Sequence, residues 1–242
     1  MSNLPSSVRI LNGLRGAANA KGVVIVIDVF RAFTVASLAV ERGASAIYPV
    51  AEIDDALALA EELKDLVLIG ERHGKKLEGF DFGNSPTEIS TADIAGRPIV
   101  HTTHAGTRGL WAVAENTREV THIFAASFAN ASATINAVLA TNSPIVSIVP
   151  LGWAGEKPTM EDSLCAHYLA AHLTAPDIAP TWTPCDLQNR LKGATSSSRF
   201  FDPDQPWAPE SDFQRCCEIN SATHALLTER QGDHLLRLRP VV

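Results

Sequence analysis

Short apolar segments alternate with longer amphipathic segments along the first 150 residues of the chain. The apolar segments are rich in β-branched residues, lack polar alternation and end at turn-forming or charged residues, which is typical of buried strands. They are residues 23–28, 45–50, 66–70, 98–103, 120–126 and 144–150. Between them, apolar residues recur at helical spacing in residues 31–42, 54–64, 107–116 and 130–141. This order predicts an α/β fold, in which helices cover both faces of a mainly parallel or mixed open sheet.

The last third of the chain has a different character. A helix expected over residues 161–173 is followed by a region rich in Pro, Trp and Ser and then by a short polar helix. Near the C-terminus, the segments THALLTE and HLLRLRP flank residues 230–233 and predict a β-hairpin. We therefore divide the chain into an α/β core over residues 1–174 and a smaller C-terminal α+β subdomain over residues 175–242, packed on the core.

Composition and charge limit the classes of partner. The chain has 20 Lys and Arg against 27 Asp and Glu, a net charge of −7, and no basic block, so we expect no nucleic-acid partner. The longest aliphatic run, residues 23–27, is too short to span a bilayer, and the first twenty residues lack the apolar core of a signal peptide. The four cysteines fit neither a zinc site nor a disulfide framework. We expect a cytoplasmic protein with no membrane partner, and a homodimer is one option for its assembly.

Unusual polar and glycine residues follow five of the predicted strands. In an open α/β sheet, ligands bind beyond the carboxyl ends of the strands, so these residues are candidates for one shared site. In chain order they are Asp28 and Arg31, then Glu71 and Arg72, then Thr103, His104, Gly106, Thr107 and Arg108, then Ser127 and Asn130, and finally Gly152.

The longest of these connections, residues 73–88, is rich in glycine and polar residues. Long ordered loops are uncommon in compact domains and tend to be functional. Its glycines would let the backbone approach a ligand, while Asp81 and Asn84 would present carboxylate and amide groups. The sequence Ser-Pro-Thr-Glu from Ser85 to Glu88 also matches a capping box, which predicts the start of a helix.

Several of these residues have a structural interpretation beside the functional one. Asp28 suits the N-terminus of the next helix as well as a catalytic role. Arg31 opposes the helix dipole, which is easier to understand if an anion binds there, although a surface arginine is the alternative. Glu161 and Asp162 follow Thr159 in a T-x-x-D capping arrangement, and their other role is metal ligation.

The segment 101–108, His-Thr-Thr-His-Ala-Gly-Thr-Arg, places three hydroxyl side chains and a glycine at a strand-to-helix junction. Hydroxyl groups and backbone N–H groups at such a junction can donate hydrogen bonds to phosphate oxygens. The segment is not a Walker loop, which requires GxxxxGK[ST]. His104 is either a ligand contact or a polar residue at the end of a strand.

The order of these motifs resembles the 2-phosphosulfolactate phosphatase family. The resemblance covers roughly residues 20–220 and rests on DVFRA at 28–32, GER at 70–72, GFDFGNSPTE at 79–88, TTHAGTR at 102–108, SFANA at 127–131 and Glu-Asp at 161–162. It implies a Mg²⁺-dependent phosphomonoesterase that releases phosphate from (2R)-2-phospho-3-sulfolactate, a small anionic substrate, and leaves 3-sulfolactate.

The resemblance also assigns roles to the candidate residues. The catalytic residues would be Asp28, Arg31, Glu71 and Asp81. The residues that bind the substrate would be Arg72, Asn84, Ser85, Thr103, His104, Gly106, Thr107, Arg108, Ser127 and Asn130. The candidates for Mg²⁺ ligands are the carboxylates Asp28, Glu71, Asp81, Glu161 and Asp162, of which only some can bind at once because Mg²⁺ takes one or two carboxylates together with waters and phosphate oxygens.

The identity of the nucleophile stays open between metal-bound water and a carboxylate such as Asp28. Position 30 is Phe, so the D-x-D signature of phosphatases that form an aspartyl phosphate is absent, which favours activated water. The loop also carries His104 and Ala105 where the family pattern usually reads TTTNGT, and we expect this change to affect substrate selection. The alternatives are a phosphatase for another small phosphorylated acid and a noncatalytic anion-binding protein.

Overall fold

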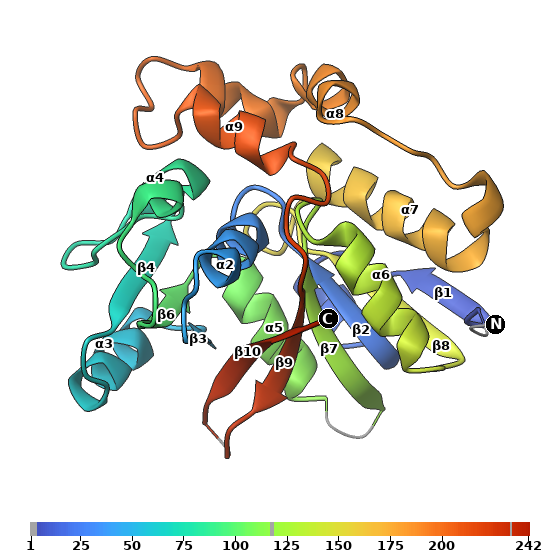
Figure 1. Ribbon diagram of the computed structural model, residues 1–242, viewed down its shortest axis with the longest axis horizontal. Coiled ribbons are helices and arrows are strands. Elements are labelled where there is room, and N and C mark those ends of the chain that lie inside the picture. Colours follow the sequence, from blue (N-terminus) through green and yellow to red (C-terminus); the bar gives the residue numbers. More distant parts are fainter. Residues whose placement is uncertain (1–3, 117–118, 233) are drawn as a thin grey trace.

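A computed structural model describes residues 4–116, 119–232 and 234–242 (Figure 1). The described residues form a ten-stranded mixed sheet of order β1-β8-β2-β7-β9-β10-β3-β6-β4-β5. The strands are β1 (Ser7–Ile10), β2 (Gly22–Ile27), β3 (Ala46–Val50), β4 (Val67–Arg72), β5 (Lys75–Lys76), β6 (Pro98–Thr102), β7 (Val120–Ala126), β8 (Ile145–Pro150), β9 (Ala225–Arg230) and β10 (Leu236–Val241). The predicted α/β fold with an open sheet is confirmed.

The helices flank this sheet. The α-helices are α1 (Gly13–Ala17), α2 (Ala32–Glu41), α3 (Ile53–Glu62), α4 (Pro86–Thr91), α5 (Gly106–Ala114), α6 (Ala131–Ala140), α7 (Met160–Thr174), α8 (Pro184–Leu191) and α9 (Glu210–Cys216), and two 3₁₀ helices are η1 (Pro176–Ile178) and η2 (Thr195–Phe201). The six strands and five helices expected from the hydrophobic pattern are all present within a few residues of their predicted bounds. The pattern did not predict the short elements β1, α1 and β5.

Strand β2 shows why its sequence lacks polar alternation. Val24 and Val26 point into a core formed with α1, α2 and α5. Val23, Ile25 and Ile27 point into a second core formed with α6, α7 and the C-terminal helices. Because successive side chains of a strand point to opposite faces, a strand covered on both faces must be apolar at every position.

The C-terminal hairpin lies inside the main sheet. Strand β9 pairs antiparallel with β7 and with β10, and β10 pairs antiparallel with β3. The hairpin therefore joins two parallel groups of strands, one formed by β1, β8, β2 and β7 and the other by β3, β6 and β4. The expected hairpin is confirmed, although Asp233 in its turn lies outside the described residues.

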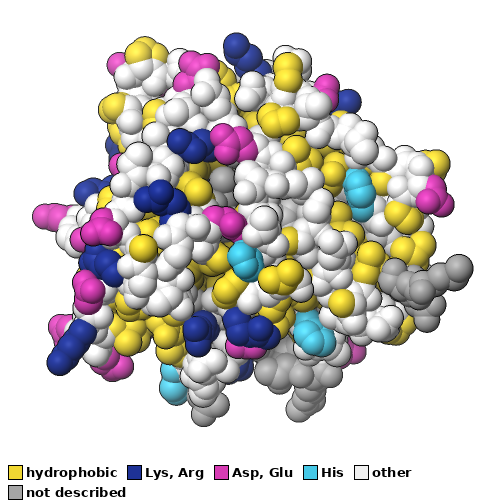
Figure 2. All heavy atoms as spheres, viewed as in Figure 1, with side chains coloured by type: hydrophobic (Ala, Val, Ile, Leu, Met, Phe, Trp, Pro, Cys, Tyr) yellow, Lys and Arg dark blue, Asp and Glu magenta, His cyan; other side chains and the backbone are white. Residues whose placement is uncertain are grey.

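The rest of the C-terminal third covers one end of the molecule. Helices α8 and α9 lie at the top in Figure 1, above α4, α2 and α7. Helix α9 packs against α4, η2 and α8. On the face seen in Figure 2, Lys and Arg side chains are interspersed with Asp and Glu. No helix in the described part of the chain is long and apolar enough to cross a membrane.

Candidate active site

A narrow pocket of about 40 Å³ lies where the segments that follow β2, β4, β6 and β8 meet η2. Eight residues chosen from the sequence line it: Asp28, Arg31, Glu71, Asn84, His104, Gly152, Glu161 and Asp162. The contacts between these segments are direct. Glu71, in β4, accepts hydrogen bonds at Oε2 from the N–H of Gly74 (2.7 Å) and at Oε1 from the N–H of His104, after β6 (2.8 Å).

Asp28 follows β2 and is buried at the centre of this arrangement. Its Oδ1 accepts a hydrogen bond from the N–H of Ala32 (3.3 Å), so the helix-start interpretation is correct, and the same carboxylate lines the pocket. Gly106 packs against it, because a Cβ there would lie 3.0 Å from Asp28 Oδ2 and 2.7 Å from the Cβ of Ala32. Gly106 is thus required for close packing of α5 against the start of α2.

Asp162 ties α7 to the ends of two strands. Its Oδ1 accepts a hydrogen bond from the N–H of Val29, after β2, and its Oδ2 accepts one from the N–H of Gly152, after β8, both at 2.8 Å. The expected T-x-x-D cap is wrong in its details, since Thr159 is the N-cap residue of α7 but makes no side-chain cap hydrogen bond. Glu161 instead accepts a 2.5 Å hydrogen bond from Ser196 Oγ of η2.

These carboxylates form a buried acidic cluster. Burial, together with the charge of Glu71 and against the hydrogen bond from Ala32, raises the pKa of Asp28 to about 7. Burial also raises the pKa of Asp162 and of Glu161, and the pKa of Asp162 rises further through the charges of Glu161 and Asp28. Carboxylates that are buried side by side resist ionisation unless a cation compensates them.

The donor set of this cluster suits a hard cation in part. Among the described residues, no three Asp, Glu, His or Cys side chains already form a metal-binding group. Mg²⁺ needs fewer protein ligands, because it usually keeps several waters and binds one or two carboxylates together with phosphate oxygens. Asp28 and Glu161 fit that requirement, since both are carboxylates that line the pocket, and they accept hydrogen bonds at Oδ1 and at Oε2, respectively.

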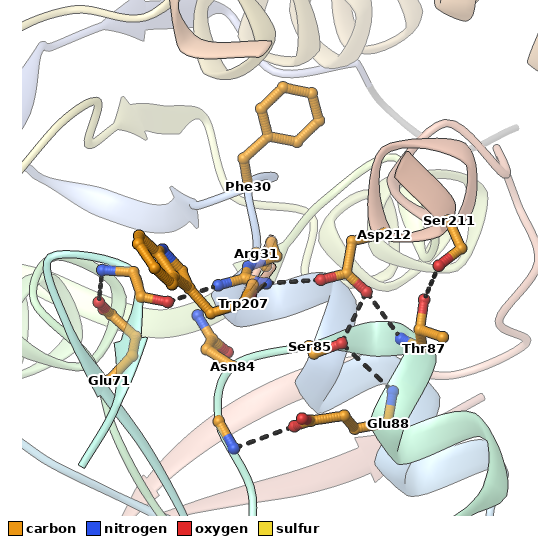
Figure 3. Close-up of polar contacts among 12 residues, drawn as sticks. Phe30, Arg31, Glu71, Asn84, Ser85, Thr87, Glu88, Trp207, Ser211 and Asp212 are labelled. Carbon is orange, nitrogen blue, oxygen red and sulfur yellow. Dashed lines mark hydrogen bonds and ion pairs between the residues drawn. The ribbon is translucent and has the colours of Figure 1, made fainter. Parts of the chain in front are cut away.

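Arg31 lines the pocket, but its guanidinium is engaged by protein groups (Figure 3). Nη1 forms a buried ion pair with Asp212 of α9 (2.5 Å) and donates to the carbonyl of Trp207 (2.9 Å). Nη2 donates to the carbonyl of Gly74 (2.9 Å). The expected anion at the start of α2 is thus supplied by Asp212. Because the charge of Arg31 is already paired with this carboxylate, the structure gives no support to the prediction that Arg31 clamps a phosphate.

Asp212 extends this network to α4, as Figure 3 shows. Its Oδ1 accepts hydrogen bonds from Ser85 Oγ (2.7 Å) and from the N–H of Thr87 (2.9 Å). Ser85 Oγ also accepts from the N–H of Glu88, as a helix N-cap does, whereas Glu88 bonds to the N–H of Gly83. The predicted start of α4 is confirmed, and the residues after β2 are joined through α9 to those before α4.

The loop 73–88 approaches the pocket with only part of its polar residues. Asn84 lines the pocket, and its Oδ1 lies 3.2 Å from Nε2 of the buried His101. Burial lowers the pKa of His101 to about 4, so the neutral ring donates to Asn84 near neutral pH. Asp81 is exposed outside the lining, where its Oδ2 accepts from the N–H of Leu68 (2.8 Å). The structure therefore gives no support to Asp81 as a catalytic residue or metal ligand.

The remaining predicted residues lie outside the pocket lining, and most form local hydrogen bonds. Arg72 donates hydrogen bonds to the carbonyls of Glu71 and Ala51 and to Thr102 Oγ1, and Ser85 donates to Asp212. Thr103 and Thr107 form hydrogen bonds with each other. Ser127 and Asn130 form the hydrogen bonds of the turn after β7. Arg108 is partly exposed on α5. Their roles in substrate binding stay predictions.

Among the lining residues that sequence reasoning did not single out are His73, Trp153, Ser196 and Arg199. The rings of His73 and His104 meet edge to face at 4.7 Å between centroids. Ser196 and Arg199 belong to η2, which follows no strand and has no regular hydrophobic pattern. The rule that ligands bind beyond the carboxyl ends of strands therefore does not predict them as site residues. The only available signal was a lone arginine in a serine-rich segment.

Comparison with known proteins identifies the chain's relatives. The sequence profile of the 2-phosphosulpholactate phosphatase family matches residues 10–229. A probable 2-phosphosulfolactate phosphatase of Synechococcus sp. (strain CC9605) is 36% identical over 212 residues, which cover 87% of this chain and 80% of that protein. Its counterpart in Bacillus subtilis (strain 168) is 31% identical over 212 residues, which cover 86% and 88%.

The fold, the acidic pocket and these relatives define a phosphatase, that is, a phosphoric monoester hydrolase. Most of the chain takes part in the match, including the strands that carry Asp28 and Glu71 and the C-terminal segment that carries Arg199. The chain belongs to the 2-phosphosulfolactate phosphatase family.

Proposed function

We propose that this enzyme hydrolyses (2R)-2-phospho-3-sulfolactate to 3-sulfolactate and phosphate, and that the reaction depends on Mg²⁺. The observation that carries the proposal is the buried cluster of Asp28, Glu161 and Asp162 at one wall of a pocket of about 40 Å³. A water molecule needs roughly 10–15 Å³ of such space, so the pocket admits a group of about phosphate size. Its acidic wall suits a metal-bridged phosphoryl group better than a free anion.

Mg²⁺, when bound, would neutralise charge on the phosphoryl oxygens and activate water. Asp28 and Glu161 are the residues proposed to hold it. Asp162 positions Asp28 by fixing the backbone at Val29, and Glu71 fixes the loop at Gly74 and His104. These hydrogen bonds hold the reacting groups in place before the substrate arrives, which is the main protein contribution to phosphoryl transfer.

Water is the proposed nucleophile. The position two residues after Asp28 carries Phe30, whose ring packs on Phe200 (5.0 Å between centroids) and Phe213 (6.0 Å) and supplies no second acid. Burial and the neighbouring carboxylates raise the pKa of Asp28 to about 7 when no cation is bound, and a bound Mg²⁺ would favour the ionised form of Asp28 that can hold it.

The test is a phosphate-release assay on a panel of phosphomonoesters, with Mg²⁺ or with excess chelator. We expect (2R)-2-phospho-3-sulfolactate to have the highest kcat/KM in the panel, and we expect release to stop in chelator and return when Mg²⁺ is added. A higher kcat/KM for phospholactate would instead favour a phosphatase for a nonsulfonated phospho acid. Full activity in excess chelator would rule out the dependence on Mg²⁺.

A further inference from the structure

We infer that Arg199 anchors the phosphoryl group of the substrate in this pocket. The inference rests on the proposed function and names the residue that binds the anion of its substrate. Arg199 lies in η2, on the C-terminal segment that covers the ends of the strands, and lines the pocket together with Asp28 and Glu161.

The guanidinium of Arg199, which borders the pocket, has a hydrogen-bond donor without a partner among the described residues. An arginine carries five N–H groups in a planar fork. Nη2 donates to the carbonyl of Phe30 (2.8 Å), whereas Nε is buried and has no hydrogen-bond partner among the described residues. Buried polar groups nearly always have a partner in native proteins, so an unpartnered donor in the wall of a pocket indicates that a ligand supplies the acceptor.

The charges around Arg199 indicate which kind of ligand this is. Burial and the charge of Arg31 lower the pKa of Arg199, while the charges of Glu161, Asp28 and Glu71 act in the opposite direction and favour its charged form. Yet no carboxylate oxygen of the described residues lies within 4.0 Å of a nitrogen of Arg199, so Arg199 forms no ion pair with them. The pocket thus keeps a guanidinium apart from the acidic cluster, as expected if a phosphoryl group with its cation belongs between them.

The position of the guanidinium is fixed by its neighbours. It lies over the ring of Trp153 (5.6 Å to the centroid) and beside the ring of Phe200 (5.0 Å). A Cβ on Gly74 would lie 3.8 Å from Nη1, so the backbone of the loop after β4 borders the same group. A guanidinium held in one plane can bind two oxygens of a phosphoryl group at once.

The shape of the surface agrees with this position. Trp153, Ser196 and Arg199 also line an open groove of about 600 Å³ that continues from the narrow pocket. Arg199 therefore stands where a phosphate-sized space opens into a wider one. A phosphoryl group anchored there leaves the rest of the ester in the groove.

Arg31 provides the internal contrast, because it is the other arginine of the pocket. Its two Nη groups donate to Asp212, Trp207 and Gly74, so its charge is already paired with a buried carboxylate, whereas the charge of Arg199 is not. We therefore expect substitution of Arg31 to affect mainly the stability of the fold, and substitution of Arg199 to affect mainly ligand binding.

The experiment measures binding of inorganic phosphate to Arg199→Gln, Arg199→Lys and Arg31→Lys by thermal shift and by competitive inhibition, with chloride at matched ionic strength. Arg190→Gln, which removes an exposed arginine of α8, is the matched control. We expect Arg199→Gln to weaken phosphate binding at least about tenfold and to lower kcat/KM by about 10²–10³-fold. Arg199→Lys should be intermediate, because lysine keeps the charge but loses the planar fork.

The outcomes separate the inference from the proposed function. Phosphate affinity within about twofold of wild type in folded Arg199→Gln, or in Arg199→Lys if the glutamine variant does not fold, would overturn the inference. A loss of phosphate affinity in Arg31→Lys as large as that in Arg199→Lys would also overturn the inference. If the wild type hydrolyses no ester in the panel but binds phosphate through Arg199, the anchor stands and the proposed function fails.

Discussion

At the scale of single residues, Asp28 combines a structural and a chemical role. It accepts a hydrogen bond at the start of α2, and it belongs to the acidic wall of the pocket. Its neighbours make ionisation costly in the absence of a cation, since burial raises its pKa to about 7 from an ordinary value of 3.8. Residues of this kind are commonly kept for function at the expense of stability.

The first prediction concerns Asp28→Asn in the presence of chelator. The neutral form of a carboxyl group whose pKa is raised on folding is favoured in the folded state, so the wild type should lose stability as pH rises from about 4 to 7. Asparagine has no such dependence. The gain in free energy of unfolding of the variant over the wild type should be larger at pH 8 than at pH 5, by on the order of 3 kcal/mol. In a separate assay with Mg²⁺, the variant should release no phosphate.

Denaturant unfolding at the two pH values measures this difference. Asp54→Asn removes an exposed carboxylate of α3 and serves as the control for activity, which it should not change. If the difference in free energy of unfolding between Asp28→Asn and wild type is the same at pH 5 and at pH 8, Asp28 has the same charge in the folded protein at both pH values, which contradicts the prediction.

At the scale of secondary-structure elements, the ion pair of Arg31 and Asp212 joins α2 to α9. Both side chains are almost fully buried, with 2% and 0% exposed. Asp212 adds the start of α4 through Ser85 and Thr87. One carboxylate thus holds three elements that are distant in sequence, and it holds them beside the pocket.

The second prediction is that breaking this pair destabilises the protein strongly. Asp212→Asn should lower the free energy of unfolding by about 3–5 kcal/mol, because it leaves the buried charge of Arg31 unpaired. The double variant Arg31→Met with Asp212→Asn should lose less than the sum of the two single changes, since the unpaired charge is gone.

Urea unfolding of the two single variants and the double variant tests this coupling. The partly exposed pair of Arg239 and Glu229 is the matched control, and Arg239→Met should cost at most about 1 kcal/mol. If the loss in free energy of unfolding of the double variant equals the sum of the losses of the two single variants, the two side chains do not stabilise the fold as a pair.

At the scale of the whole molecule, the C-terminal residues complete the sheet. Leu226, Leu236 and Leu238 of the hairpin are buried in the core shared with α2 and α5. Without β9 and β10, strands β7 and β3 would become open edges, which are prone to aggregation. The chain up to residue 174 therefore lacks the part that joins its two groups of parallel strands.

The third prediction is that a fragment of residues 1–174 does not fold by itself. We expect no cooperative thermal transition by circular dichroism and aggregation in size-exclusion chromatography. Removal of the fully exposed Val242 alone is the control and should leave the transition unchanged. A fragment that folds cooperatively would support the division into a core and an appended subdomain that the sequence predicts.

The sequence by itself determined the strands and helices of the α/β pattern, the edge of the sheet that carries the pocket, and the acidic residues that line it. These features follow from local periodicity and from the rule that ligands bind at the carboxyl ends of strands. Only the tertiary structure decided that the C-terminal hairpin lies in mid-sheet, that Asp212 neutralises Arg31, and that Arg199 faces the pocket. Each of these depends on a pairing between segments far apart in the chain, and no local pattern of residues encodes which distant segment will supply the partner.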